Sequence, residues 1–221
     1  MTTVSRRVGV FGGAFDPPHR AHVALVEAAV QTLQLDAVYV VPTGEAAHKE
    51  PAKTAAAHRL AMARLAFADV PQAIVDDCEV LRRGPSLMVD SLAALSEKDR
   101  NATKPQQTNV AWYLIIGLDQ LSRFESWVQW QNIAAQCHLA VAYRGEAAGP
   151  ALDPLALPLV INEWAGKGVR VTTVPFKPLA ISSSAVRAAI QSAEGAIWQD
   201  WVPAQVTNYI ATNQLYQDAT P

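Results

Sequence analysis

Residues 9 to 22 read Gly-Val-Phe-Gly-Gly-Ala-Phe-Asp-Pro-Pro-His-Arg-Ala-His, and they indicate the fold more strongly than any other part of the chain. The apolar run Val8 to Phe11 leads into two glycines, and an apolar-periodic segment begins after the two prolines. This order predicts a strand, a tight turn and the start of a helix. The glycines let the backbone approach a ligand closely, Asp16 is a favourable N-cap residue, and a proline suits the first helical turn.

The helix predicted behind this turn is suited to binding an anion. The first N–H groups of a helix lack partners within the helix and lie at the positive end of its dipole. His19 and His22 are three residues apart, so they share one face of the first turn. Two imidazoles beside free amides form a site for a polyphosphate, whereas surface histidines or half of a metal site are the alternative interpretations.

The segment resembles the signature of the nucleotidyltransferase superfamily that carries a His-x-Gly-His motif. It is most similar to the Gly-Gly-Thr-Phe-Asp-Pro-Pro-His-x-Gly-His of bacterial nicotinate-nucleotide adenylyltransferases, with Ala14 in place of Thr and Ala21 in place of Gly. The resemblance implies catalytic roles for His19 and His22. It also implies that ATP is bound by Gly12, Gly13, Ala14, Phe15, His19 and His22.

A second anion-binding element is predicted in residues 178 to 187, Pro-Leu-Ala-Ile-Ser-Ser-Ser-Ala-Val-Arg. An arginine near a helix N-terminus opposes the dipole, and a bound anion would explain it. The alternative is a serine N-cap followed by a solvated arginine. Because the segment resembles the Ile-Ser-Ser-Thr-x-Ile-Arg of the same family, it implies that Ser182, Ser183, Ser184 and Arg187 bind the ATP phosphates and that Arg187 is catalytic.

The acceptor side is predicted from a third group of matches. Ile115-Ile-Gly-Leu-Asp119 predicts a strand that ends in an acid, and this acid either binds a ligand or caps the next helix. The family resemblance favours a catalytic, substrate-binding Asp119. It also implies substrate-binding roles for Trp127 of a Phe-x-x-Trp motif, for Arg144 and for Lys49, while Trp130 is expected in the core. Leu87-Met88 stands where the family has Tyr-Thr, and Val128 where it often has an aromatic residue.

The wider pattern predicts an α/β fold. Apolar, β-branched runs predict strands at Val8–Phe11, Ala37–Val41, Ala73–Val75, Trp112–Ile116, Leu139–Tyr143 and Val169–Val174. Helical patterns lie at Ala21–Leu33, Ala55–Ala68, Ser86–Glu97, Leu121–Ala135, Ser184–Gln191 and Ala204–Asn213. The alternation predicts a doubly wound, mostly parallel, Rossmann-like sheet in a single domain spanning residues 1–221, with a C-terminal helical part at about 178–216. Loops are expected at 43–54 and 99–109, and a connector at 145–158.

Composition excludes several classes of protein. Half of the 221 residues are hydrophobic, 17% are charged and the net charge is −2, so a large core is expected and nucleic-acid binding is not. No apolar stretch approaches a membrane span, and the apolar run behind Arg6-Arg7 is too short for an export signal. Cys78 and Cys137 form no ligand pattern and fit a reduced, cytoplasmic protein.

These observations together predict adenylyl transfer. The resemblance implies that ATP and nicotinate mononucleotide are the substrates, with Mg²⁺ bridging phosphate oxygens and no metal cage built by the protein. The alternatives are another acceptor, such as nicotinamide mononucleotide or phosphopantetheine, a cytidylyl transfer, or a nucleotide-binding module without catalysis.

Overall fold

The computed structural model describes residues 6–46, 52, 54–102, 109–144, 157–176, 179–192 and 196–217. Its centre is a six-stranded sheet in the order β4-β2-β1-β6-β7-β8, in which every strand pair is parallel. The strands are β1 (Arg6–Gly13), β2 (Ala37–Pro42), β4 (Ala73–Val75), β6 (Val110–Gly117), β7 (Cys137–Arg144) and β8 (Val171–Phe176). The predicted doubly wound, parallel α/β fold is therefore confirmed.

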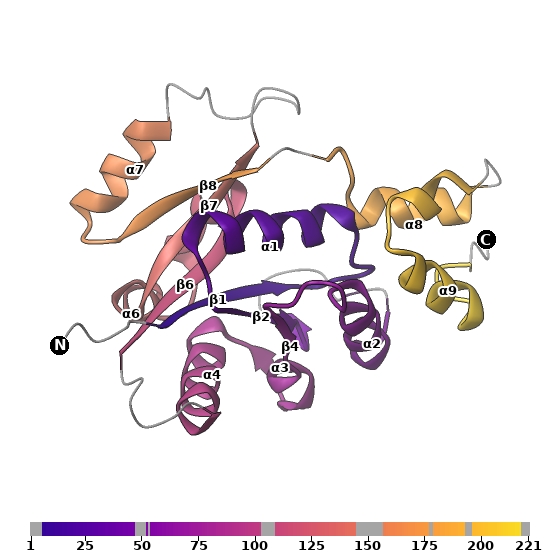
Figure 1. The fold of residues 1–221 in the computed structure, drawn as a ribbon, viewed down its shortest axis with the longest axis horizontal. Helices are drawn as coiled ribbons and strands as arrows, with labels where there is room; N and C mark the ends of the chain where they lie inside the picture. Colours follow the sequence, from indigo (N-terminus) through magenta and orange to yellow (C-terminus); the bar gives the residue numbers. More distant parts are fainter. Residues whose placement is uncertain are drawn as a thin grey trace.

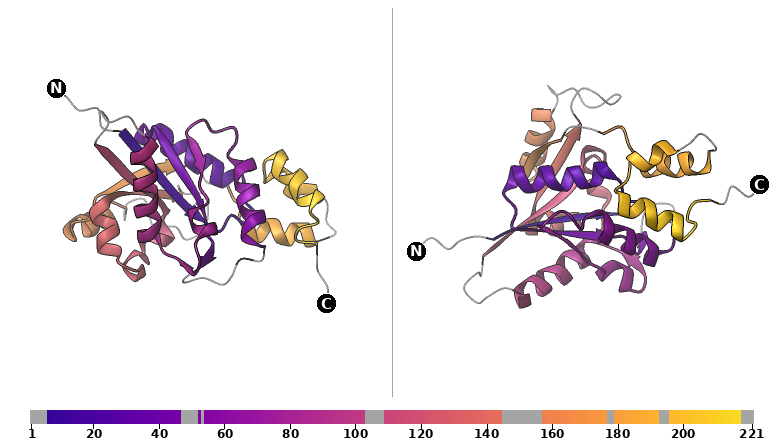
Figure 2. Two further views of the ribbon diagram at one scale, coloured as in Figure 1. Left: turned by 90° about the horizontal axis from the view of Figure 1, so that it is seen from below. Right: turned by 45° about the vertical axis from the view of Figure 1, so that its right-hand side comes forward.

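Helices cover both faces of this sheet (Figures 1 and 2). One face packs against α1 (Arg20–Leu33), α2 (Ala56–Ala66), α8 (Ser183–Gln191) and α9 (Ala204–Thr212). The other face packs against α4 (Met88–Ala102), α6 (Trp130–Gln136) and α7 (Leu157–Gly166). The short elements are α3 (Cys78–Leu81), α5 (Leu118–Leu121), the 3-10 turns η1 (Phe124–Ser126) and η2 (Ala196–Asp200), and a separate parallel pair of β3 (Glu45–Ala46) and β5 (Pro85–Ser86).

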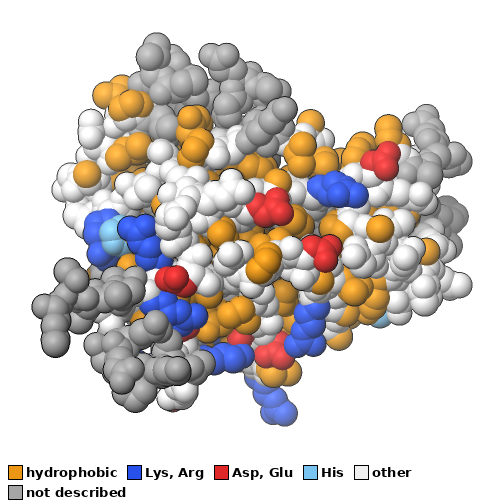
Figure 3. Space-filling model, viewed as in Figure 1, with side chains coloured by type: hydrophobic (Ala, Val, Ile, Leu, Met, Phe, Trp, Pro, Cys, Tyr) orange, Lys and Arg blue, Asp and Glu red, His pale blue; other side chains and the backbone are white. Residues whose placement is uncertain are grey.

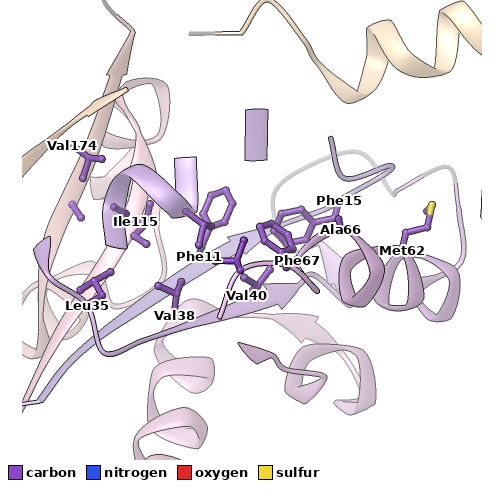
Figure 4. Close-up of a cluster of buried hydrophobic side chains, with 14 of the residues drawn as sticks. Phe11, Phe15, Leu35, Val38, Val40, Met62, Ala66, Phe67, Ile115 and Val174 are labelled. Atoms are coloured by element: carbon purple, nitrogen blue, oxygen red, sulfur yellow. The ribbon is translucent and has the colours of Figure 1, made fainter. Parts of the chain in front are cut away.

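Each face of the sheet has its own hydrophobic core. Successive side chains of a strand point to opposite faces, so one strand supplies both cores. In β2, Val38 and Val40 join the cluster under α1, whereas Tyr39 and Val41 join the cluster under α4. Figure 4 shows part of the first cluster, with Phe11 of β1 beside Val40 of β2. A sheet buried on both faces explains the continuous apolar runs in the sequence.

The predicted helix Leu121–Ala135 is wrong, because the chain breaks there into α5, η1 and α6. Trp127 has an extended backbone (φ −74°, ψ 139°), and Gln129 is left-handed (φ 57°, ψ 39°). Neither conformation continues an α-helix. The break leaves Trp127 on a turn between two short helical pieces, where it borders a pocket instead of lying within a helix.

The predicted loops also need correction. Helix α4 continues to Ala102, so residues 99–102 are helical. Asp99 lies in that last turn, 1% exposed, where it accepts hydrogen bonds from Arg6 and from the Tyr39 hydroxyl. The predicted loop at 43–54 contains β3, and α7 begins at Leu157 within the predicted connector, most of which lies outside the described residues.

The surface drawn in Figure 3 is mixed in charge. Lys and Arg side chains are interspersed with Asp, Glu and hydrophobic side chains on that face, and the described residues form no continuous basic area there. None of the helices in the described ranges is both long enough and apolar enough to cross a membrane.

Candidate active site

The histidine pair lies where β1 leads into α1, at the carboxyl edge of the sheet. His19 is the N-cap residue of α1, with an extended backbone (φ −140°, ψ 170°). Its N–H donates to Nδ1 of His22 at 3.1 Å, and the two rings stack with centroids 3.7 Å apart. The predicted shared face is confirmed. Asp16 is not the N-cap that the sequence predicts, because the chain turns through two prolines before the helix begins.

The protonation of His22 follows from this packing. Burial, and then the neighbouring His19, lower the pKa of His22 well below its ordinary value. Because Nδ1 accepts the hydrogen bond from the His19 backbone, the neutral ring carries its proton on Nε2. Phe15 also packs against the His22 ring edge-on, with the two ring centroids 5.1 Å apart. His22 is thus an oriented, neutral N–H donor.

One serine and the arginine of the second predicted element contact the first element directly. Ser183 Oγ donates to the carbonyl of Pro17 at 2.8 Å, and Nη1 of Arg187 donates to the carbonyl of Asp16 at 2.6 Å. Nη2 of Arg187 donates to Ser184 Oγ at 3.2 Å. The fold therefore joins residues that are more than 160 positions apart in the chain.

Three further hydrogen bonds join the C-terminal part to Asp16 and to Arg20, the first residue of α1. The Tyr216 hydroxyl donates to Oδ1 of the buried Asp16 at 2.7 Å. Arg20 donates its backbone N–H to the Trp201 carbonyl at 2.9 Å and its Nε to the Asp200 carbonyl at 2.8 Å. Ser182 is the N-cap of α8, and its Oγ accepts from the N–H of Ala185 at 3.1 Å.

A pocket of about 360 Å³ opens beside the turn after β1. Its walls come from the ends of β1 and β6, from the β5 region and from the broken segment after β6. The predicted site residues among its walls are Gly12, Gly13, Ala14 and Trp127. Trp127 is half-buried and packs edge-on against Phe124 at 5.5 Å. Trp130 packs against Phe124 and Trp164, so its predicted core role is confirmed.

The other predicted substrate residues are not among the pocket walls that the structure describes. Asp119 lies in the first turn of α5, exposed, and its Oδ2 accepts from Nε2 of Gln120 at 2.8 Å, but Asp119 does not line the pocket. Arg144 ends β7 opposite Phe176 of β8, and its side chain lies outside the described residues. Lys49 lies outside them as well.

Arg59 is a pocket residue that sequence reasoning missed. It lies on α2, 2% exposed, and donates to three carbonyls: Nε to Thr54 at 3.0 Å, Nη1 to Ala14 at 2.8 Å and Nη2 to Gly44 at 3.1 Å. It thereby connects the turn after β1 to the loop after β2. An arginine between apolar helix positions, Ala56 to Ala66, was the available signal.

Glu79 is the second pocket residue that sequence reasoning missed. It lies on α3, 3% exposed, and accepts a hydrogen bond from Ser91 Oγ at 2.7 Å. Burial raises its pKa above the ordinary value. A Cβ at Gly44 would lie 2.1 Å from the Glu79 carbonyl oxygen, so only glycine lets the loop after β2 pass this close to α3.

A second, polar pocket of about 580 Å³ is lined by Arg187. Its walls include Thr54, His58, Ser184 and Tyr216, and the Tyr209 hydroxyl lies 2.9 Å from Nδ1 of His58. Arg187 and Ser184 line this second pocket, whereas His19 and His22 line neither of the two pockets.

Comparisons with known proteins identify the family of the chain. Residues 10–189 match the family model described as cytidylyltransferase-like. The probable nicotinate-nucleotide adenylyltransferase of Bordetella petrii is 38% identical over 213 residues, covering 96% of this chain and 100% of the relative. That of Albidiferax ferrireducens is 42% identical over 216 residues, covering 97% and 100%.

A solved structure shares the fold. The Plasmodium falciparum nicotinic acid mononucleotide adenylyltransferase complexed with NaAD superposes with a TM-score of 0.69 at 18% identity, over 96% of this chain and 97% of that one. The solved structure shows the shared fold, whereas the sequence identity to the bacterial relatives over nearly the whole chain shows the family. The chain belongs to the cytidylyltransferase-like family and, within it, to the nicotinate-nucleotide adenylyltransferases.

Proposed function

We propose that the protein transfers the adenylyl group of ATP to nicotinate mononucleotide, forming deamido-NAD and pyrophosphate. One observation carries the proposal. The His19–His22 pair and the N-terminus of α8 are joined through Pro17 and Asp16, beside a pocket that Trp127 lines. The relatives that bear this activity in their names span the whole site.

The proposed reaction is an in-line displacement at the α-phosphorus of ATP. A phosphate oxygen of the acceptor forms the new P–O bond, and the bond to the β-phosphate bridging oxygen breaks, releasing pyrophosphate. Neither step needs a nucleophilic side chain, because positioning and charge stabilisation supply the catalysis. Nε2–H of His22 is the group that donates to the charge developing on the α-phosphate, with His19 beside it.

The remaining residues are assigned roles from their positions in the site. Ser183, Ser184 and Arg187 hold the β- and γ-phosphates, because Ser183 and Arg187 bond to the loop before the histidines and Ser184 bonds to Arg187. The segment Gly12–Phe15 and Ser182 are proposed to contact ATP. Asp119 is proposed to take part in catalysis and to bind the acceptor. Trp127 stacks on the pyridine ring, and Lys49 and Arg144 stay proposed acceptor ligands.

Mg²⁺ is proposed to arrive with ATP as part of the substrate. Among the described residues, no group of three or more His, Cys, Asp and Glu side chains could hold a metal ion. The ion is proposed to be held by phosphate oxygens and water. When bound, it neutralises phosphate charge.

We also propose one nucleotidyltransferase domain over residues 1–221, since Val186 and Ile210 share a core with Phe11. A cytoplasmic location is proposed from the family's role in nucleotide metabolism and from two unpaired cysteines.

The test is pyrophosphate release from Mg-ATP with nicotinate mononucleotide, nicotinamide mononucleotide and phosphopantetheine supplied separately. We expect strong preference for the first. Preference for another acceptor would overturn the proposal that nicotinate mononucleotide is the acceptor. ATP binding without pyrophosphate release would identify a non-catalytic module.

A further inference from the structure

The Tyr216 hydroxyl bonds to the turn that carries the signature motif. It donates to Oδ1 of Asp16 at 2.7 Å, across 200 positions of the chain. Asp16 is only 3% exposed, and a buried carboxylate requires hydrogen-bond donors. Burial raises the pKa of Tyr216 above its ordinary value, so the phenol is a neutral donor. A hydroxyl that donates to a carboxylate forms one of the stronger hydrogen bonds in proteins.

Asp16 also contacts the segment proposed to bind the ATP phosphates. Its carbonyl accepts from Nη1 of Arg187 at 2.6 Å, and the carbonyl of Pro17 accepts from Ser183 Oγ at 2.8 Å. Asp16 therefore bonds to Tyr216 through its side chain and to Arg187 through its backbone. A shift of the carboxylate would also move the carbonyl that orients the Arg187 guanidinium.

The guanidinium of Arg187 is oriented from two sides. Besides the Asp16 carbonyl, it contacts Ser184, since Nη2 of Arg187 donates to Ser184 Oγ at 3.2 Å. A guanidinium has further N–H donors, so these two bonds orient it and leave other donors for a phosphate. Tyr216, Ser184 and Arg187 line the same second pocket, and none of its described walls is an Asp or a Glu.

The backbone around Tyr216 has an unusual conformation. Gln214 and Tyr216 are both left-handed, with φ of 52° and 65°, which few residues other than glycine adopt. The N–H of Leu215 donates to the Ile210 carbonyl at 3.0 Å and so ties the turn to α9. The Tyr216 side chain also packs against the core under α1. A phenylalanine would fill the same space, so packing alone does not account for the hydroxyl.

We propose that Tyr216 is a positioning residue for adenylyl transfer, which acts through Asp16 to orient the Arg187 guanidinium toward the ATP phosphates. This inference rests on the proposed function and deepens it, because Tyr216 lies outside both phosphate-binding segments. In this role Tyr216 does not touch ATP. Loss of its hydroxyl weakens ATP binding through Arg187, and it affects the acceptor little because Tyr216 does not line the 360 Å³ pocket.

The test compares two tyrosine hydroxyls that each donate to a buried aspartate. Tyr216→Phe removes the bond to Asp16. The control, Tyr39→Phe, removes a bond of 3.1 Å to Asp99, which is 1% exposed, and Tyr39 lines neither pocket. Both changes keep the aromatic ring, so both variants should fold with a lowered Tm. The readouts are the Kd of Mg-ATP by calorimetry, KM for ATP, KM for nicotinate mononucleotide, and Tm.

We expect Tyr216→Phe to raise the Kd and the KM of ATP about tenfold, the scale of one hydrogen bond to a charged group. KM for nicotinate mononucleotide should change less than about twofold, as for a site that the substitution does not reach. Tyr39→Phe should lower Tm and leave all three constants unchanged. A purely structural role for Tyr216 would instead make the two variants alike.

A double-mutant cycle tests whether the effect passes through Arg187. In an Arg187→Ala background, adding Tyr216→Phe should change the Kd of Mg-ATP less than about twofold, because the group that Tyr216 positions is gone. A tenfold loss in both backgrounds would show that Tyr216 acts independently of Arg187 and would overturn the proposal.

The outcomes separate this inference from the proposed function. If the unaltered protein binds Mg-ATP but releases no pyrophosphate with nicotinate mononucleotide, the proposed function fails, and the calorimetric comparison still tests Tyr216. If pyrophosphate is released but Tyr216→Phe binds ATP as tightly as Tyr39→Phe does, only the role of Tyr216 is overturned.

Discussion

Replacing Arg59 with methionine tests whether one buried guanidinium holds two pocket loops together. Methionine has a similar apolar stem, so most of the volume at this 2% exposed position stays filled. What is lost are donors to the carbonyls of Ala14, Gly44 and Thr54. The expected result is a loss of folding free energy and a displaced turn after β1.

The magnitude follows from these three bonds. A hydrogen bond to a charged group contributes about 1.5–3 kcal/mol, and an unpaired buried carbonyl costs about 1–3 kcal/mol. Removing the guanidinium recovers several kcal/mol of its desolvation cost. The net loss we expect is therefore about 2–4 kcal/mol, a large share of the roughly 5–15 kcal/mol that stabilises a domain.

Urea unfolding measures this loss, and Arg64→Met is the matched control. Arg64 lies on the same helix, but its side chain is 55% exposed and pairs with Asp77 at 3.1 Å, so its replacement should cost less than about 1 kcal/mol. Because Arg59 connects loops on both sides of the pocket, its variant should also raise KM for ATP and for the acceptor. Equal stabilities of the two variants would refute the reasoning.

Other perturbations test the site one group at a time. His22→Ala should lower kcat about 100-fold or more and change ATP affinity far less, measured by steady-state kinetics and calorimetry; near-normal kcat contradicts its role. Burial keeps the folded pKa of His22 below the ordinary 6.5, so the unfolded chain binds the proton first and stability should fall as pH drops below about 6.5. In urea titrations His22→Gln should flatten this decline, and an unchanged slope counts against the assignment. Tyr216→Phe removes the hydrogen bond to Asp16 and should lower the free energy of unfolding by about 1–2 kcal/mol, measured by thermal unfolding. An unshifted Tm would show that the contact does not stabilise the fold. Trp127→Ala should raise KM for the acceptor at least about tenfold with little change for ATP, and the reverse pattern would move the pyridine ring elsewhere.

Local patterns predicted much of this fold. The apolar run, the glycines and the histidine spacing are contiguous in sequence, and the structure has β1, a turn and α1 there. The alternation of apolar strands and helices predicted the parallel sheet, because each βαβ unit is formed by a contiguous stretch of sequence. The predicted bounds Ala73–Val75 of β4 agree with the structure.

Features that depend on distant contacts were not predicted. The run Leu121–Ala135 has helical periodicity, but the left-handed Gln129 breaks it, and no glycine marks the position. Asp16 looks like an N-cap in isolation, yet its carboxylate accepts from Tyr216, 200 residues later. Arg59 was missed because its partners are backbone carbonyls, so its place among apolar helix positions was the one signal and no partner side chain supported it.

The attachment of residues 16–20 to residues 183–216 has a consequence for synthesis on the ribosome. Ribosomes make the histidine turn first, but Arg187, Trp201 and Tyr216, which hold it, are made near the end. A nascent chain therefore completes the proposed nucleotide site only after nearly all of the chain has been translated. Incomplete translation products that stop before residue 183 carry the entire signature motif and still lack the groups that orient it.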